Sequence, residues 1–240
     1  MMSNEMGFAS FRSQMKLSKE EICREIFLHN SDSIKIRKEG VAVRNLSRIL
    51  DAALKLCNSK GFSSMSLRDL SRESGLSMGA MYSYFRSKED LLRMIQAQGR
   101  SVVLRVLGRV TEGIDDPLLK LRRVIQAHLY ASEVLQPWFY LSYMETRNFP
   151  RDEYKKSIEA ELFTENMLIE IIDSGQKRGL FKSMDAVLLG AVIKSMLQDW
   201  YLKRWKYYKR KMSVEQYSEF LLNFIESSIL CDTRLEEFTE

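Results

Sequence analysis

Residues 75–91 read GLSMGAMYSYFRSKEDL, and this stretch decides the fold. Its first three residues, 75–77, form a Gly-apolar-Ser turn in which the serine can cap a following helix. Upstream, Ser66 is followed three residues later by an aspartate, which is the pattern of a second helix start. The spacing therefore predicts one short helix over about 66–75 and another over about 77–85. Two short helices joined in this way form a helix-turn-helix, whose second helix enters a DNA major groove.

The rest of the chain also has a helical pattern. Apolar residues recur at helical spacing, for example through 46–57 and 91–110. No stretch of alternating apolar and polar residues is bounded by Asn-Gly or Asp-Gly, the residue pairs that mark hairpin turns. We predict an all-α fold with a DNA-binding domain at 41–90 and a helical ligand-binding and dimerisation domain at 91–240. Residues 1–40 form an N-terminal extension.

This extension carries a signal for one short helix. Ser18 and Glu21 have the spacing of a capping box, and Ile22 and Ile26 follow at helical spacing. The first interpretation is a loosely docked arm. The alternative is an arm that contacts DNA.

Composition excludes several classes of protein. With 45% hydrophobic and 10% aromatic residues the chain is not disordered, and no apolar run reaches the ~18 residues of a membrane span. The first ten residues lack the order of a signal peptide, and the three cysteines form no CxxC pair. We expect a cytoplasmic protein with no membrane partner and no metal. The net charge of +5 (37 basic minus 32 acidic residues) suits a nucleic-acid partner only weakly.

Catalytic machinery is not visible in the sequence. There is no Gly-x-Ser-x-Gly elbow and no phosphate-binding loop. The two histidines, His29 and His128, lie far apart in the chain. We expect neither a cofactor nor enzyme activity.

The stretch 75–91 closely resembles the signature of the TetR family of transcriptional regulators. That signature has a Gly-apolar-Ser turn, a glycine, an apolar-Tyr pair and a phenylalanine, then Ser-Lys-Glu and a leucine. The segments 49–53, 61–62 and 66–70 fit the same family at the right distances, so the resemblance covers roughly residues 44–92. It implies a DNA-binding head, a ligand-responsive helical body and a homodimer.

The low profile of Gly79, Ala80 and Ser83 would let the second helix approach base edges closely. Met78 stands where the family often has a polar residue, and it suits an apolar contact such as a thymine methyl. The resemblance makes Ser66, Tyr82, Tyr84 and Lys88 phosphate-positioning residues. A packed core position for Tyr84 and a merely solvated Arg44 are the alternatives. The predicted DNA-binding residues are Arg44, Ser66, Ser77, Met78, Gly79, Ala80, Tyr82, Ser83, Tyr84 and Lys88.

Aromatic residues and methionines are frequent in the middle of the body, as in apolar ligand pockets. Pro137 lies within a helical pattern and would kink that helix and open space beside it. The alternative for each candidate is a place in the core. The predicted ligand-binding residues are Tyr130, Trp138, Tyr143, Met144, Phe163, Met167, Met196 and Trp200.

The last two long helices, at about 185–205 and 213–230, are the expected dimer interface by resemblance. The small residues Gly190, Ala191 and Ser195 on the first would suit close packing. A basic run at 203–211 is either a solvated helix end or a site for an anionic group. Segments after Glu145 faintly resemble the fatty acyl-CoA-responsive branch of the family.

We therefore predict a repressor that a largely apolar small molecule releases from a palindromic operator in double-stranded DNA. An effector like a fatty acyl-CoA is favoured, and an aromatic drug-like compound comes second. The alternative is a helical ligand-binding protein or enzyme whose helix-turn-helix binds no operator.

Overall fold

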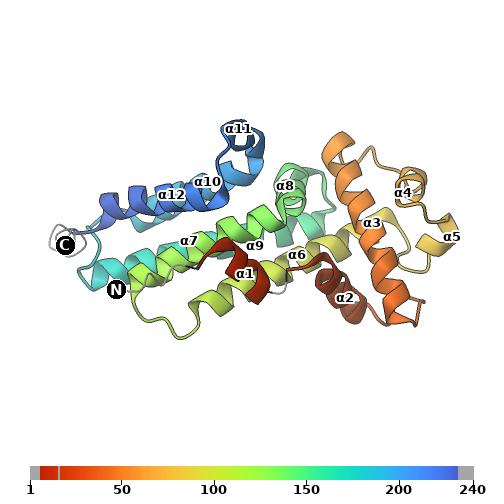
Figure 1. Ribbon diagram of the computed structural model, residues 1–240, viewed down its shortest axis with the longest axis horizontal. Coiled ribbons are helices and arrows are strands. Elements are labelled where there is room, and N and C mark those ends of the chain that lie inside the picture. Colours follow the sequence, from red (N-terminus) through yellow and green to blue (C-terminus); the bar gives the residue numbers. More distant parts are fainter. Residues whose placement is uncertain (1–5, 16, 232–240) are drawn as a thin grey trace. The chain divides into compact units, whose positions relative to one another are not determined.

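The computed structural model describes residues 6–15 and 17–231, and these form an all-α chain (Figure 1). The predicted fold class is confirmed: the described residues contain no strand, only an isolated antiparallel bridge between Phe181 and Leu230. None of their helices is long and apolar enough to cross a membrane. In chain order the helices are α1 (Phe8–Gln14), α2 (Lys19–His29), α3 (Glu39–Lys60), α4 (Leu67–Ser74), α5 (Met78–Met81), α6 (Lys88–Thr111), α7 (Pro117–Val134), α8 (Gln136–Met144), the 3-10 turn η1 (Thr146–Asn148), α9 (Arg151–Lys177), α10 (Ala186–Leu202), α11 (Arg204–Lys209) and α12 (Val214–Ile229).

Packing divides the chain into two compact units. The head unit comprises the described residues of 15–102 and 135–158, and the body unit comprises those of 1–14, 103–134 and 159–240. These limits differ from the predicted domain boundaries at 40 and 90, because segments far apart in the sequence pack together.

Two hydrogen bonds show why the segment after residue 134 packs with the head unit. The indole N–H of Trp138 donates to the carbonyl of Ile95 in α6, at 3.0 Å. Glu145 accepts from the backbone N–H of Phe62, at 3.3 Å. The functional division at residue 90 stays a prediction.

In the head unit, α3 is the central helix and contacts α2, α4 and α8. Its buried face includes Leu46 and Ile49, which are at most 1% exposed, and Leu70 of α4 is fully buried. At the end of α3, Gly61 has φ +83°, a conformation that L side chains rarely adopt.

The N-terminal extension is an integral part of the fold. The predicted Ser18–Glu21 capping box is present and starts α2, and Ile22 and Ile26 are buried against the head unit. A second helix, α1, was not predicted; its Phe11 is fully buried beside Tyr130 of α7, with ring centroids 5.5 Å apart. A loosely docked arm is therefore wrong for the described part of the extension.

In the body unit, α7 contacts α1, α10 and α12. Pro117 is the first residue of α7, where its missing N–H has no helical partner to lose, and the Asp116 carboxylate caps this helix by accepting from the N–H of Leu119 at 2.8 Å.

Pro137 does not kink a helix, which corrects the prediction. α7 ends at Val134 and a new helix, α8, begins at Gln136 with Pro137 in its first turn, where its missing N–H costs nothing.

Candidate nucleic-acid interface

The predicted helix-turn-helix is formed by α4, the turn at Gly75 and α5. Ser66 caps α4: its hydroxyl accepts from the N–H of Asp69 at 3.2 Å, and the Asp69 carboxylate accepts from the N–H of Ser66 at 3.1 Å. Ser77 caps α5 by accepting from the N–H of Ala80 at 3.2 Å. These serines therefore fix the starts of both helices, and their hydroxyls are already engaged within the protein.

The turn depends on Gly75 and on Arg48 of α3. Gly75 lies in the left-handed region, with φ +65°. The guanidinium of Arg48 donates to the carbonyls of Ser74 at 2.9 Å and Gly75 at 3.0 Å, which satisfies the end of α4. A Cβ at position 75 would lie 2.7 Å from that guanidinium. This role of Arg48 was not visible in the sequence, because its partners are carbonyls that only the fold brings near.

The exposed face of α5 has a low profile. Gly79 is exposed, Met78 and Ala80 are half-buried, and the side chain of Tyr82 is 46% exposed. A Cβ built on Gly79 meets no atom within 4 Å. Apart from Tyr82, this surface offers little side-chain bulk, so another molecule can approach the helix backbone closely.

The second helix is shorter than predicted. α5 ends at Met81, and the chain continues in tighter turns, with the N–H of Ser83 donating to Ala80 and that of Tyr84 to Met81. The carbonyl of Ser83 instead accepts from the backbone N–H of Lys35, at 2.8 Å. A segment of the N-terminal extension therefore binds the turn that follows α5.

Tyr84 is a core residue, which corrects its predicted role at a phosphate. It is 1% exposed, and its hydroxyl accepts from the side-chain amide of Asn45 at 2.9 Å. Burial raises the pKa of its phenol. The half-buried partner Asn45 gave no signal in the sequence, because it lies on a different helix.

Lys88 has a different set of partners from the predicted phosphate. Its ammonium donates to the carbonyls of Phe62, Ser63 and Met65, at 3.3, 3.0 and 3.3 Å. It also lies 4.8 Å from the centroid of the Phe62 ring. These contacts use its donors to hold the loop between α3 and α4. Arg44, by contrast, is exposed on α3.

Comparison with known proteins agrees with this geometry. Residues 49–95 match the family model of bacterial regulatory proteins of the tetR family. The transcriptional regulator HbdR of Aromatoleum sp. (strain CIB) is 25% identical over 179 residues, covering 75% of this chain and 78% of HbdR. The crystal structure of the TetR-family regulator PfmR of Thermus thermophilus is 29% identical, with a TM-score of 0.67, over 75% of this chain and 98% of PfmR.

The helix-turn-helix of this chain is that of the TetR family. Over 75% of its length the chain is similar to transcriptional regulators of that family. The ketosteroid regulator KstR2 of Mycobacterium tuberculosis shares the fold, with a TM-score of 0.71 at 17% identity over 79% of this chain and 96% of KstR2.

The predicted effector residues of this chain are not brought together in one described cavity. Trp138, Tyr143 and Met144 belong to the head unit, and the other five belong to the body unit. Trp200 is fully buried and stacks on Tyr217 at 5.1 Å. For Trp200 the alternative interpretation, a core position, is the one the structure supports.

The remaining predicted effector residues are also dispersed. Tyr130 is buried against α1, whereas Phe163 is 44% exposed on α9. Met167 lines a small cavity of about 240 Å³ between α7 and α9, beside the Arg178–Asp115 ion pair of 2.9 Å. Met196 lines a different groove, on α10.

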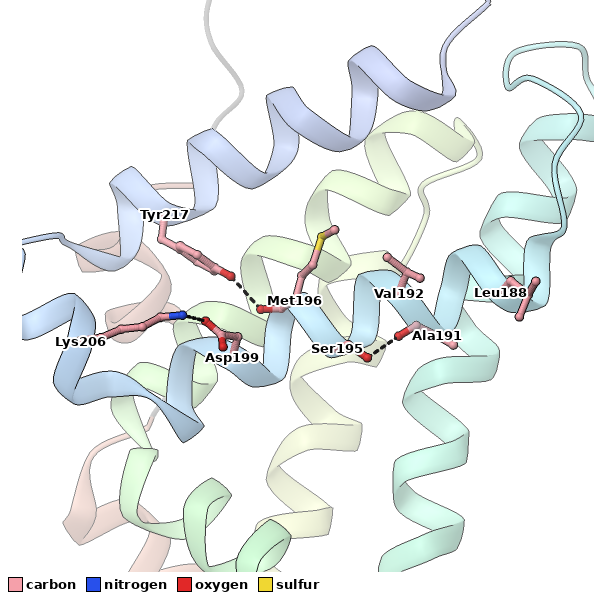
Figure 2. A pocket seen from close by; sticks show the side chains of 8 residues that line it. All are labelled: Leu188, Ala191, Val192, Ser195, Met196, Asp199, Lys206 and Tyr217. Carbon is pink, nitrogen blue, oxygen red and sulfur yellow. Dashed lines mark hydrogen bonds and ion pairs between the residues drawn. The ribbon is translucent and has the colours of Figure 1, made fainter.

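This second groove has a volume of about 560 Å³ and is lined mostly by α10 (Figure 2). Tyr217 reaches across from α12, and its hydroxyl donates to the carbonyl of Met196 at 2.8 Å. The ammonium of Lys206 pairs with Asp199 at one end. The lining residues are Leu188, Ala191, Val192, Ser195, Met196, Asp199, Lys206 and Tyr217.

Half of the basic run at 203–211 is neutralised within the body unit. Lys203 and Lys206 both pair with Asp199, and Arg204 binds Glu133 through two contacts of 2.8 Å. Three more exposed cations of the run lie at 209–211. Most of this run is therefore a solvated helix end whose cations form ion pairs within the protein.

Proposed function

We propose that this protein is a homodimeric repressor of the TetR family that binds a palindromic operator and is released by a largely apolar small molecule. The exposed, low-profile face of α5 carries the proposal, because a side-chain-poor helix on a capped turn can enter a major groove. Two copies related by a two-fold axis would read symmetric half-sites.

Within this proposal, the DNA-binding residues fall into two groups, one for the base edges and one for the phosphates. Met78, Gly79, Ala80 and Ser83 face the base edges. The exposed hydroxyl of Tyr82 and the guanidinium of Arg44 bind phosphates. Ser66 and Ser77 contribute through the helix starts that they cap, whose N–H groups attract anions.

Selection of bound sequences from random duplex DNA by the purified full chain tests the operator. We expect enrichment of one sequence with two-fold symmetry, and half-sites spaced by about one helical turn or a multiple of it. Recovery of unrelated sequences after repeated rounds would refute operator binding.

The dimer is proposed to form through α10 and α12. Both helices pack on α7, yet large apolar side chains on them are exposed: Val187 by 58%, Leu188 by 65% and Phe220 by 66%. Phe224, 48% exposed, stacks on Phe220 at 6.3 Å. Exposed apolar side chains of this size favour burial against a second copy.

The small residues of α10 play different roles in this surface. Gly190 was expected at the dimer interface. It is instead buried, and a Cβ there would lie 2.6 Å from the side chain of Ile169, so it serves packing within the protomer. Ala191 and Ser195 line the open groove.

The double change L188E/F220E tests the interface by sedimentation. We expect dimers for the wild type and monomers for the variant, because two buried carboxylates per protomer cannot be desolvated against the partner. L104E, at a residue 47% exposed on α6, is the matched control and should stay dimeric. A dimeric L188E/F220E protein would place the interface elsewhere.

For the effector, fatty acyl-CoA remains the first class to test and aromatic drug-like compounds the second. Support comes from the aromatic and methionine content of the body and from the exposed cations at 209–211, which could meet the carrier's phosphates. Tryptophan fluorescence should report affinity that rises with acyl chain length, by about 0.8 kcal/mol for each methylene that becomes fully buried. Equal affinity across the series, or binding that leaves operator affinity unchanged, would count against this class.

A further inference from the structure

The chain between α2 and α3, residues 34–38, is fixed against the recognition helix. Its first residue, Ile34, is 1% exposed, and the N–H of Ile34 donates to the carbonyl of Asn30 at 2.9 Å. The next N–H, of Lys35, donates to the carbonyl of Ser83 at 2.8 Å. The backbone of this segment is therefore held in place beside the turn that follows α5.

The lysine side chains of this segment form an exposed, positively charged surface. Lys35 and Lys38 are exposed, and neither forms an ion pair with any residue in 6–15 or 17–231. Glu39 is the one acidic residue between 35 and 48, and Arg24 binds it at 2.8 Å. Its carboxylate is therefore paired with Arg24 and with neither of the two lysines.

The position of these lysines indicates which groups they would bind. A major groove is about 12 Å wide and is bordered on both sides by phosphates. Cations tied to the end of a helix that lies in the groove must stand near that border. Four consecutive residues span at most about 10 Å between the first and last Cα, so both lysines serve the same stretch of backbone.

We propose that Lys35 and Lys38 bind operator phosphates, so that the N-terminal extension is a second DNA contact physically joined to the recognition helix. This rests on the proposed operator binding. The extension thus has both a structural role, through its backbone and buried side chains, and a binding role, through two lysines.

The test compares the K35Q/K38Q double variant with the wild type. Both changes keep the backbone N–H groups and the buried residues, so the thermal transition followed by circular dichroism should not move. Binding is measured between 50 and 300 mM salt on a duplex recovered by selection and on a scrambled duplex of the same composition. Each lost phosphate contact lowers the slope of log K against log salt by about 0.9, so we expect a fall of about 1.8 per bound protomer on both duplexes.

K155Q/K177Q is the matched control, because it removes the same charge from two exposed lysines of α9. It should leave the slope at the wild-type value. A wild type that binds neither duplex would refute the proposed function itself. A wild type that binds while K35Q/K38Q keeps its slope, or an equal fall in both double variants, would overturn the second contact.

Discussion

Lys88 is the residue at which sequence and structure give opposite roles. Its ammonium serves three carbonyls of the loop between α3 and α4, so removing it should weaken the fold and not the DNA contact. We predict that Lys88→Met lowers the free energy of unfolding by about 1–3 kcal/mol, since hydrogen bonds to a charged group are lost. Urea denaturation measures this change. A fall of about one unit in the salt slope of DNA binding, with stability unchanged, would restore the phosphate role instead.

His128 is a second residue with a measurable consequence. It is 4% exposed, and its Nε2 lies 3.3 Å from the ammonium of Lys194. Burial, and then the charge of Lys194, hold its pKa well below the ordinary value of 6.5. The folded protein therefore keeps this histidine neutral at a pH where the unfolded chain protonates it.

The unfolded state thus binds one more proton below pH 6.5, and stability must fall as the pH drops through that value. We predict a loss of up to about 1.4 kcal/mol per pH unit between 6.5 and 5.5, measured by urea denaturation. His128→Gln should remove this slope, whereas His29→Gln, at an exposed position, should keep it. A slope that persists in His128→Gln would assign the proton to another group.

At the scale of elements, local signals predicted helix starts well. The serine caps at 18, 66 and 77 are all formed, because a cap depends only on residues within one turn. The end of α5 was misplaced: the chain passes into tighter turns after Met81, and the Ser83 carbonyl binds the N–H of Lys35, some fifty residues away. Pro137 was predicted to kink a single helix because the apolar pattern continues from α7 into α8. The sequence pattern therefore did not show that one helix ends and another begins there.

The site was less predictable than the fold for the same reason. The exposed positions of α5 follow from the turn and its cap, but the burial of Tyr84 depends on Asn45 of another helix. The predicted effector residues share only their composition, and the chain distributes them over two packing units. Composition indicates apolar character and contains no information on which residues meet.

The unpredicted helix α1 gives a prediction at this scale. Phe11 is fully buried against Tyr130, so Phe11→Ala leaves a cavity in the body unit. We expect the free energy of unfolding to fall by about 3–5 kcal/mol. Leu28→Ala, in the same extension at a side chain 56% exposed, should change it by less than about 0.5 kcal/mol. Equal, small effects in thermal or urea unfolding would mean that α1 is not docked as described.

At the scale of the whole molecule, the account requires sequence-specific DNA binding through one helix face. Gly79 allows a clean test, because a side chain added there meets no atom within 4 Å and the position needs no positive φ. Gly108 of α6 is exposed and equally open, and it belongs to the body unit. In both helices a change from glycine to glutamine favours the helix by up to about 1 kcal/mol, so neither variant should unfold.

The decisive measurement is the ratio of affinities for the selected duplex and a scrambled duplex, in the wild type, Gly79→Gln and Gly108→Gln. A glutamine at 79 would hold the backbone of α5 away from the base edges, so that ratio should fall at least tenfold, a change of about 1.4 kcal/mol. Gly108→Gln should keep the wild-type ratio. An unchanged ratio in Gly79→Gln would contradict base readout by this face.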